Sequence, residues 1–276
     1  MTIDLHTHSN RSDGTDTPTE LVENAKAAGL DVVALTDHDT TVGWDEAEAA
    51  AERVGIRLVK GIEVSTELEH RSIHLLGYGI DPGHARLVDE LTKVIDGRTG
   101  RVPKFVARFR AIGIEVTEEE ILAKVGDADA VGRPHLADVL IDKGVVETRD
   151  QAFAEYLSPG QPGYVGRYSI PTDEAVELVK AAGGKAVVAH PWSRGSQRVL
   201  SPDRIAQLVE AGLDGIEVDH PDHDEEQRAQ LRKIAAEHDL VVTGSSDYHG
   251  TGKGPEFRLG ANTTRPEELE RLLEGS

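Results

Sequence analysis

The chain of 276 residues contains no cysteine. Disulfide bonds, thiolate metal ligands and cysteine nucleophiles are therefore excluded, so any metal site has to use nitrogen and oxygen ligands. No apolar run reaches the roughly 18 residues of a membrane-spanning helix. The first residues, MTIDLHTHS, are too polar for a secretory signal. From these absences we expect a cytoplasmic protein with no membrane segment.

Basic side chains are scarce. The chain has 30 Lys and Arg residues against 50 Asp and Glu residues, which gives a formal net charge of −20. Such a chain is not expected to have the broad basic face through which proteins bind nucleic acid non-specifically. A small anionic substrate stays compatible with this charge, because bound cations can invert the local electrostatics of an acidic site.

Aromatic residues make up only 4% of the chain, and hydrophobic residues 38%. This composition suits small-residue helices packed on a sheet of Val and Ile. Strand and helix patterns alternate in the first 80 residues and return from residue 170, which predicts an α/β fold with a parallel sheet. About seven core strands favour a distorted barrel over an open sheet. We expect these strands at residues 3–5, 31–36, 57–64, 72–78, 186–189, 215–218 and 240–243.

The segment 81–169 differs in character. Its apolar residues recur at helical spacing, and it contains no convincing buried strand, so we predict a helical insertion into the α/β domain. Gly97, Gly100 and Pro103 are expected to interrupt the helix there, because glycine and proline are poor helix formers. The interruption leaves the placement of Arg98 and Arg101 open.

Six histidines and three carboxylates lie in short motifs, most of which follow a predicted strand. In a strand, side chains two residues apart point to the same side, so His6 and His8 can reach one ion. Asp247 and His249 repeat this spacing. Histidine and carboxylate ligands suit Mn, Fe or Zn. The nine candidate ligands are His6, His8, Asp13, His38, Glu63, His74, His190, Asp247 and His249.

Three further aspartates adjoin these candidates. Asp4 and Asp37 each flank a candidate histidine, where either could accept the second N–H of the imidazole. Asp4 fits equally well as an ordinary carboxylate at the start of a strand, with no role at the site. We interpret Asp39 as a helix-capping or turn residue, because aspartate favours those places.

The motifs DLHTHS, SDG, TDHD, GIE, HLLGY, AHP and SSDYHG together resemble those of the PHP (polymerase and histidinol phosphatase) family. Within it, the chain is similar to small stand-alone phosphoesterases that act on nucleoside 3′,5′-bisphosphates and short oligonucleotides. The resemblance covers nearly the whole chain. It implies a distorted (β/α)7 barrel formed by residues 1–80 and 170–276, with residues 81–169 as a helical insertion that caps the substrate.

The resemblance also implies two or three divalent ions, Mn, Fe or Zn, in sites that share Glu63. Asp13 stands where some family members have histidine. By motif, the first site is His6, His8, Glu63 and Asp247, the second Glu63, His74 and His190, and the third Asp13, His38 and His249.

The implied reaction is hydrolysis of nucleotide phosphomonoesters by a metal-activated hydroxide, which needs no protein nucleophile. Ser245 and Ser246 adjoin Asp247, but the sequence supports no Ser-His-Asp arrangement. One alternative is a phosphatase for a small metabolite such as histidinol phosphate. Another is a non-catalytic metal-binding regulatory module, which a lost ligand would favour. The expected partner is a small phosphorylated anion, with short RNA as a variant.

Contacts to the substrate are open to two readings. Arg133 and His135, in the motif GRPH, resemble a family phosphate-binding motif but also suit the start of a helix. His220 is either an acid facing the site or a surface histidine, and Arg194 is a weaker candidate for a phosphate contact. The remaining histidines are predicted to be exposed and uninvolved: His70, His84, His223 and His238.

Overall fold

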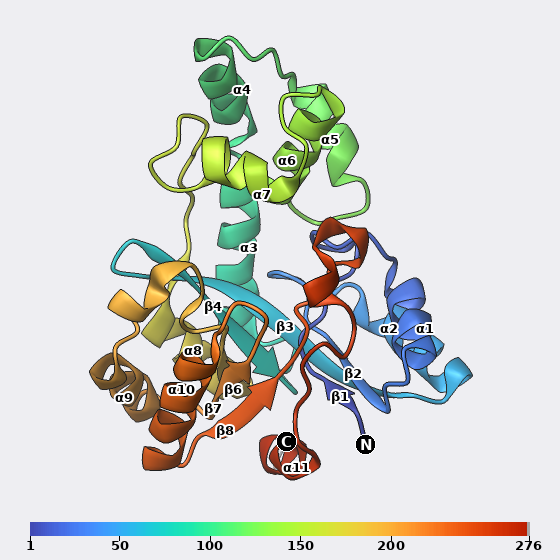
Figure 1. Ribbon diagram of the computed structural model, residues 1–276, viewed down its shortest axis with the longest axis vertical. Helices are drawn as coiled ribbons and strands as arrows, with labels where there is room; N and C mark the ends of the chain where they lie inside the picture. The colour runs from blue at the N-terminus through green and yellow to red at the C-terminus, as the bar shows by residue number, and fades with distance from the viewer. Residues whose placement is uncertain (275–276) are drawn as a thin grey trace.

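Seven strands follow one another around a strongly curved sheet that nearly closes into a barrel (Figure 1). The structure, a computed structural model, describes residues 1–274. The segments that follow the first and last strands approach each other, as shown by the hydrogen bond from His8 N to Tyr248 O at 2.8 Å. In spatial order the strands are β1 (Ile3–Asp4), β2 (Val32–Leu35), β3 (Arg57–Leu68), β4 (Arg71–Tyr78), β6 (Lys185–Ala189), β7 (Gly215–Asp219) and β8 (Val241–Gly244), while the short β5 (Ile170–Pro171) pairs with β3.

The prediction of an all-parallel sheet was wrong for β4. This strand runs antiparallel to both of its neighbours, β3 and β6. The reason is a two-residue hairpin, in which Glu69 and His70 both take positive φ angles of 48° and 62°. Such turns match the twist of paired strands. Because β4 is reversed, His74 near its beginning lies at the end of the barrel where the parallel strands terminate.

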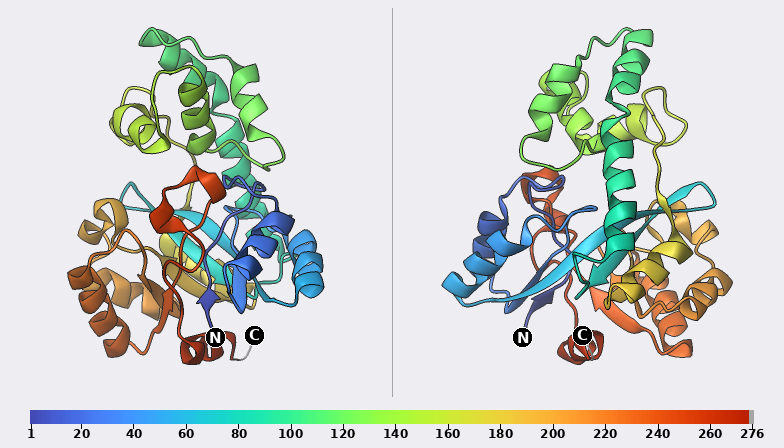
Figure 2. Two further views of the ribbon diagram at one scale, coloured as in Figure 1. Left: turned by 45° about the vertical axis from the view of Figure 1, so that its right-hand side comes forward. Right: turned by 180° about the vertical axis from the view of Figure 1, so that it is seen from behind.

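Helices cover the outside of the sheet (Figure 2). Side-chain caps fix where several of them begin: Thr17 and Glu20 form a capping box at one helix, and Asp224 and Gln227 at another. The helices of the barrel are α1 (Pro18–Ala27), α2 (Trp44–Val54), α8 (Thr172–Ala181), α9 (Pro202–Glu210), α10 (Glu225–Glu237) and α11 (Pro266–Leu273). Within residues 1–274, no helix is both long and apolar enough to cross a membrane.

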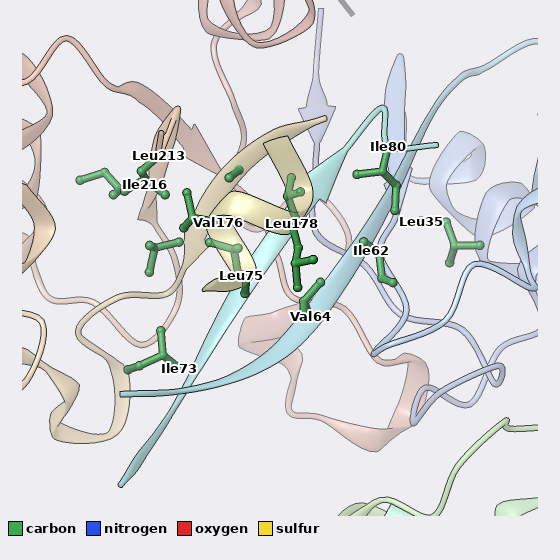
Figure 3. Packing of buried hydrophobic residues seen from close by; sticks show 14 of the residues in the cluster. Leu35, Ile62, Val64, Ile73, Leu75, Ile80, Val176, Leu178, Leu213 and Ile216 are labelled. Atoms are coloured by element: carbon green, nitrogen blue, oxygen red, sulfur yellow. The ribbon is translucent and has the colours of Figure 1, made fainter. Parts of the chain in front are cut away.

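Two layers of apolar side chains hold the barrel together. Between sheet and helices, Ile62 and Leu75 belong to the same buried cluster as Val176 of α8 (Figure 3). Inside the barrel, a second cluster surrounds Tyr78, whose hydroxyl donates to Leu5 O at 2.8 Å. This filled interior leaves the carboxyl end of the barrel as the place where polar side chains gather.

Residues 81–169 contain helices and no strand, as the periodicity predicted. The segment rises away from the barrel in Figure 1 and has its own apolar cluster around Phe105 and Phe109. Its elements are α3 (Ala85–Thr99), α4 (Val102–Ala111), α5 (Glu118–Val125), α6 (Arg133–Asp142), α7 (Arg149–Ala152) and a π-helical turn (Phe153–Leu157).

The predicted interruption near residue 97 is displaced. Helix α3 continues through Gly97 to Thr99, and Gly100 is its C-terminal cap. Pro103 lies in the first turn of α4, where proline is tolerated because the first N–H groups of a helix have no partner. The break therefore spans only two residues, and Arg98 stays on the last turn of α3.

Candidate metal centre

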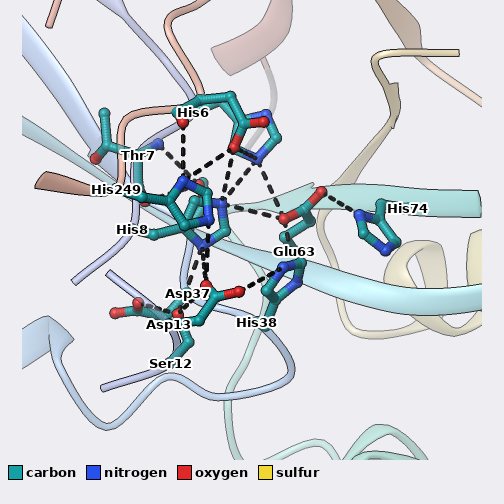
Figure 4. Close-up of polar contacts among 12 residues, drawn as sticks. His6, Thr7, His8, Ser12, Asp13, Asp37, His38, Glu63, His74 and His249 are labelled. Carbon is teal, nitrogen blue, oxygen red and sulfur yellow. Dashed lines mark hydrogen bonds and ion pairs between the residues drawn. The ribbon is translucent and has the colours of Figure 1, made fainter. Parts of the chain in front are cut away.

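All nine predicted ligands converge at the carboxyl end of the barrel (Figure 4 shows seven of them labelled). They fall into four overlapping groups, and within each group the potential ligand atoms lie within 4.8 Å of one another. The groups divide the ligands differently from the three implied sites, since His8 also joins the third set and Glu63 is shared by two groups that contain His190 and His74 separately. The groups are His6, His8 and Asp247; His6, Glu63 and His190; His38, Glu63 and His74; and His8, Asp13, His38 and His249.

Glu63 lies at the centre of this arrangement, with five imidazole rings around its carboxylate. Its Oε2 is 3.2 Å from His6 Nε2, 3.1 Å from His8 Nε2 and 3.1 Å from His38 Nδ1. Its Oε1 is 2.8 Å from His74 Nδ1 and 3.2 Å from His190 Nε2. Burial opposes ionisation of Glu63, but the surrounding imidazoles, His38 first, hold its pKa well below the usual value. One carboxylate thus faces two sets of nitrogen ligands.

The tautomer of His6 follows from its partner Glu217. The two groups approach at 3.1 Å, from His6 Nδ1 to Glu217 Oε1. Burial disfavours the charged form of Glu217, but His6 and other imidazoles keep its pKa far below the ordinary range, so it is an acceptor. His6 Nδ1 therefore carries a proton, and its Nε2 faces His8 Nε2 at 3.0 Å. Burial opposes the charged form of His6, but the surrounding carboxylates, Glu63 first, raise its pKa well above the ordinary value.

Several ring nitrogens and carboxylate oxygens face one another closely in this cluster. His6 Nε2 and His8 Nε2 lie 3.6 Å and 3.5 Å from Asp247 Oδ1, in addition to their contacts with Glu63. His38 Nδ1 is buried close to Glu63 yet forms no hydrogen bond. Only positive charge can satisfy such a cluster. The donor set therefore fits divalent cations bound by nitrogen and oxygen.

A third group surrounds Asp13. Its carboxylate lies 3.2 Å from His249 Nε2 and 3.8 Å from His38 Nε2. His249 Nδ1 donates to the carbonyl of Asp247 at 2.8 Å, which leaves Nε2 as the acceptor. Burial, together with the charge of Lys253, lowers the pKa of His249 to about 4. This imidazole is consequently neutral near pH 7, the form in which histidine binds metals.

Glu217 is a site residue that sequence reasoning missed, as is Lys253, which pairs with Asp247. Glu217 is fully buried in β7 and also accepts hydrogen bonds from His190 N, at 2.7 Å, and from Ser245 Oγ. The sequence does place an acidic residue inside the apolar run GIEV, which could have indicated a buried functional carboxylate, but no recognised motif includes it.

Neither flanking aspartate hydrogen-bonds an imidazole, so of the two alternatives for Asp4 the ordinary structural carboxylate is the one observed. Asp4 accepts backbone N–H groups of Ser246 and Gly260, at 3.0 Å and 2.9 Å, and Asp37 accepts hydrogen bonds from Ser9 and Ser12. Both carboxylates fasten the loops that carry ligands, whereas Glu217 contacts an imidazole directly.

His220 faces the centre and is not the surface histidine that one alternative predicted. It is fully buried, its Nδ1 accepts the N–H of Asp222 at 3.1 Å, and its Nε2 therefore donates to Asp247 Oδ2 at 3.3 Å. Lys253 also contacts Asp247 Oδ2 and lies over the ring of Phe257. Both groups bind the outer oxygen of Asp247, so Oδ1 is left to face the cluster.

The prediction of four exposed histidines holds fully only for His70. His223 is buried, because its Nδ1 donates to Val218 O at 2.9 Å and its Nε2 accepts the N–H of Trp192 at 3.2 Å. His84 and His238 are half-buried. Within residues 1–274, none of these four histidines belongs to one of the four ligand groups of the centre.

The three predicted substrate contacts lie around this centre. His135 accepts the N–H of Gly132 at 3.0 Å, which closes the start of α6. Burial lowers the pKa of His135, although the nearby charge of Asp13 opposes this shift. Arg133 donates to Leu157 O at 3.2 Å. Arg194 lines a pocket together with His74 and His190, and its φ of 53° places it in a left-handed turn.

Known proteins resemble this chain in both sequence and structure. The PHP domain family matches residues 4–125. A 3′,5′-nucleoside bisphosphate phosphatase from Chromobacterium violaceum is 37% identical over 91% of this chain and 88% of its own. The chain belongs to the PHP family. It is accordingly a metal-dependent phosphoesterase by family, which confirms the predicted reaction class.

Two further relatives show how far substrates vary within the family. A 5′-3′ exoribonuclease from Haemophilus influenzae is 37% identical over 89% of this chain and 89% of its own. A phosphoribosyl 1,2-cyclic phosphate 1,2-diphosphodiesterase from Eggerthella lenta is 35% identical over 95% of this chain and 100% of its own. All act on phosphate esters, so the comparisons support the reaction class more strongly than any one substrate.

A solved structure confirms the fold. The crystal structure of a proposed metal-dependent phosphoesterase from Bifidobacterium adolescentis superimposes with a TM-score of 0.92 at 40% identity, covering 98% of this chain and 95% of the other. The distorted barrel predicted from the strand count is therefore the fold of this PHP protein.

Proposed function

We propose that this PHP protein removes a phosphate from a small nucleotide that carries more than one phosphate, such as a nucleoside 3′,5′-bisphosphate or a short 5′-phosphorylated oligonucleotide. The single observation that carries the proposal is the Glu63 carboxylate with imidazoles on both of its oxygens. When bound there, divalent cations would supply Lewis-acid activation of water and charge stabilisation at the phosphate.

The protein's own residues would hold and orient the reactants. Glu63 bridges two ligand sets, and two or three ions of Mn, Fe or Zn are the number and kind we propose. Glu217 fixes the lone pair of His6 toward the centre, and His220 and Lys253 fix Asp247 so that one oxygen faces inward. The proposed ligands are His6, His8, Asp13, His38, Glu63, His74, His190, Asp247 and His249.

A surplus of half-buried positive charge supports a substrate with an additional phosphate. Burial, and then the charge of Arg194, lowers the pKa of Arg133 to about 10. Burial, and then the charge of Arg98, lowers the pKa of Arg167 to about 9. Within residues 1–274, neither Arg133 nor Arg167 forms a hydrogen bond or ion pair with a carboxylate: Arg133 donates to Leu157 O, and Arg167 to Tyr168 O and Ser169 Oγ. A phosphate bound between them would relieve this repulsion, and arginine matches phosphate oxygens well.

In this proposal the helices of residues 81–169 cap the substrate. Arg133 comes from α6, Arg167 from the segment that returns to the barrel, and Arg194 from the loop after β6. The metal ligands come from the barrel. The substrate would therefore lie between the two parts, with its reacting phosphate toward Glu63 and its second phosphate toward the arginines.

Phosphate release after reconstitution with Mn²⁺ tests the proposal. The panel is adenosine 3′,5′-bisphosphate, AMP, histidinol phosphate and a short 5′-phosphorylated RNA, with His8→Ala as the inactive control. We expect metal-dependent turnover of the bisphosphate to exceed that of AMP. Preferred turnover of histidinol phosphate would favour the small-metabolite alternative, and shortening of RNA the exonuclease one. Absence of turnover with metals bound would favour the non-catalytic alternative.

A further inference from the structure

One arginine of the helical insertion reaches down to the barrel loop that carries His38. Arg98, on the last turn of α3, donates from Nη2 to Asp39 Oδ2 at 2.6 Å and to Ser65 Oγ at 2.7 Å. The arginine side chain is 9% exposed, and that of Asp39 is fully buried. This ion pair therefore connects the insertion to the interior of the barrel rather than to its surface.

Asp39 fastens the turn after His38 to strand β3. Its N–H donates to Glu63 O at 3.0 Å, and its Oδ1 accepts the N–H of Ser65 at 2.6 Å. Its φ of 59° lies in the left-handed region, which non-glycine residues adopt only when surrounding contacts hold them there. Arg98 is the charged partner among those contacts.

Three candidate ligands depend on this junction. His38 directly precedes Asp39, and Glu63 lies two residues before Ser65 on β3. In the β3–β4 register, Ser65 is opposite His74. His38, Glu63 and His74 form one of the four ligand groups. Arg98 consequently lies behind a complete group, at the point where the three segments that carry it meet.

We propose that Arg98 is a positioning residue of the metal centre, which acts through Asp39 and Ser65 to fix His38, Glu63 and His74 relative to one another. The inference rests on the proposed metal-dependent function. It assigns the insertion a second task, because the insertion then completes the geometry of the metal centre as well as covering the substrate. Groups that hold metal ligands from behind typically change metal affinity 10–100-fold when removed.

Calorimetric titration of the metal-free full-length protein with Mn²⁺ tests this. We expect Arg98→Met to weaken one class of Mn²⁺ site by about 10–100-fold and to leave the others unchanged. Arg98→Lys keeps the charge and one donor, so it should restore part of the affinity. Because Arg98 acts through Asp39, the double variant Arg98→Met/Asp39→Asn should lose no more Mn²⁺ affinity than whichever single variant binds Mn²⁺ more weakly.

Arg101→Met is the matched control. Arg101 is equally buried and lies three residues further on, but its hydrogen bonds go to Val165 O and Val131 O inside the insertion, both at 3.3 Å, and not to a ligand-bearing segment. We expect it to lower the melting temperature without changing Mn²⁺ affinity. If Arg98→Met fails to fold, Asp39→Asn, which keeps the size of the side chain, takes its place in the comparison.

The outcomes separate two failures. Equal Mn²⁺ affinity in wild type and Arg98→Met would overturn this inference alone. An equal loss in Arg101→Met would also overturn it, because disruption of the insertion would then explain the effect. A wild-type protein that binds no Mn²⁺ would overturn the proposed function itself, and the inference with it.

Discussion

Glu217 and His6 meet at 3.1 Å inside the barrel, and this contact decides which nitrogen of His6 faces the metal centre. The carboxylate can only accept, so His6 presents Nε2 inward. Glu217 also accepts the backbone N–H of His190 at 2.7 Å. One buried carboxylate thus holds two of the nine candidate ligands, although it belongs to none of the four ligand groups.

Glu217→Gln should weaken Mn²⁺ binding by about 10–100-fold, as is typical for groups that orient a ligand. The amide can donate to His6 Nδ1, which would reverse the tautomer and turn the lone pair away from the centre. Calorimetric titration measures the affinity. Glu225→Gln, on the exposed first turn of α10, is the control. Unchanged affinity in Glu217→Gln would show that His6 needs no such partner.

Lys253→Met should destabilise the metal-free protein more than the metal-loaded one. Lys253 pairs with Asp247, whose side chain is only 4% exposed, so the variant leaves a buried carboxylate without its ammonium. We expect a loss of about 1–3 kcal/mol, less than for a fully buried pair because Lys253 is 22% exposed. Mn²⁺ should then raise the melting temperature more in the variant than in the wild type.

Lys233→Met provides the comparison for that measurement. Lys233 is 79% exposed and lies 3.8 Å from Glu237, so its removal should change neither the melting temperature nor the response to Mn²⁺. An Mn²⁺ shift in Lys253→Met no greater than that of the wild type would contradict the idea that the ammonium and the metal stabilise the same carboxylate.

The burial of His223 should make the unfolding free energy of the protein sensitive to acid. Burial lowers its pKa below the reference value of 6.5, although its bond to the Val218 carbonyl opposes the shift. The unfolded chain therefore takes up a proton first. The contribution to stability is complete above pH 6.5 and is lost as the pH falls from there toward the lower folded-state pKa.

His223→Gln removes this titration and retains a donor and an acceptor. We expect the difference in unfolding free energy between wild type and variant to shrink as the pH falls from about 7 to about 5, measured by urea denaturation. His70→Gln is the control, because His70 is 98% exposed. A difference that stays constant across this range would refute the assignment.

Tyr78→Phe should lower the unfolding free energy by about 1–3 kcal/mol, because it leaves the carbonyl of Leu5 without a donor in the barrel interior. Leu5 directly precedes His6, so a small loss of Mn²⁺ affinity should accompany the loss of stability. Tyr168→Phe, which removes an exposed hydroxyl bonded to Glu90, should be nearly neutral in both measurements. Chemical denaturation and titration distinguish the two variants.

Local patterns were enough to predict most elements of the barrel. The strands predicted at residues 72–78, 186–189 and 215–218 agree within one residue at each end with β4, β6 and β7. The reversal of β4 was not predictable in the same way, because an apolar strand pattern carries no direction. The positive φ angles at Glu69 and His70, which set that direction, depend on the pairing of the two strands.

The sequence by itself determined the nature of the ligands. The absence of cysteine and the paired spacing of His6 with His8, and of Asp247 with His249, identified a nitrogen and oxygen site before any contact was known. These features are local, since side-chain type and the two-residue strand period are properties of a short segment.

Only the tertiary structure decided which groups stand behind those ligands. Glu217 orients His6 from 211 residues away, Arg98 reaches Asp39 across 59 residues, and His220 reaches Asp247 across 27. Hydrogen bonds between residues so distant in sequence leave no spacing pattern to read. They exist because closing the barrel and folding the insertion over it removes these polar groups from water, so that each must find a partner within the protein.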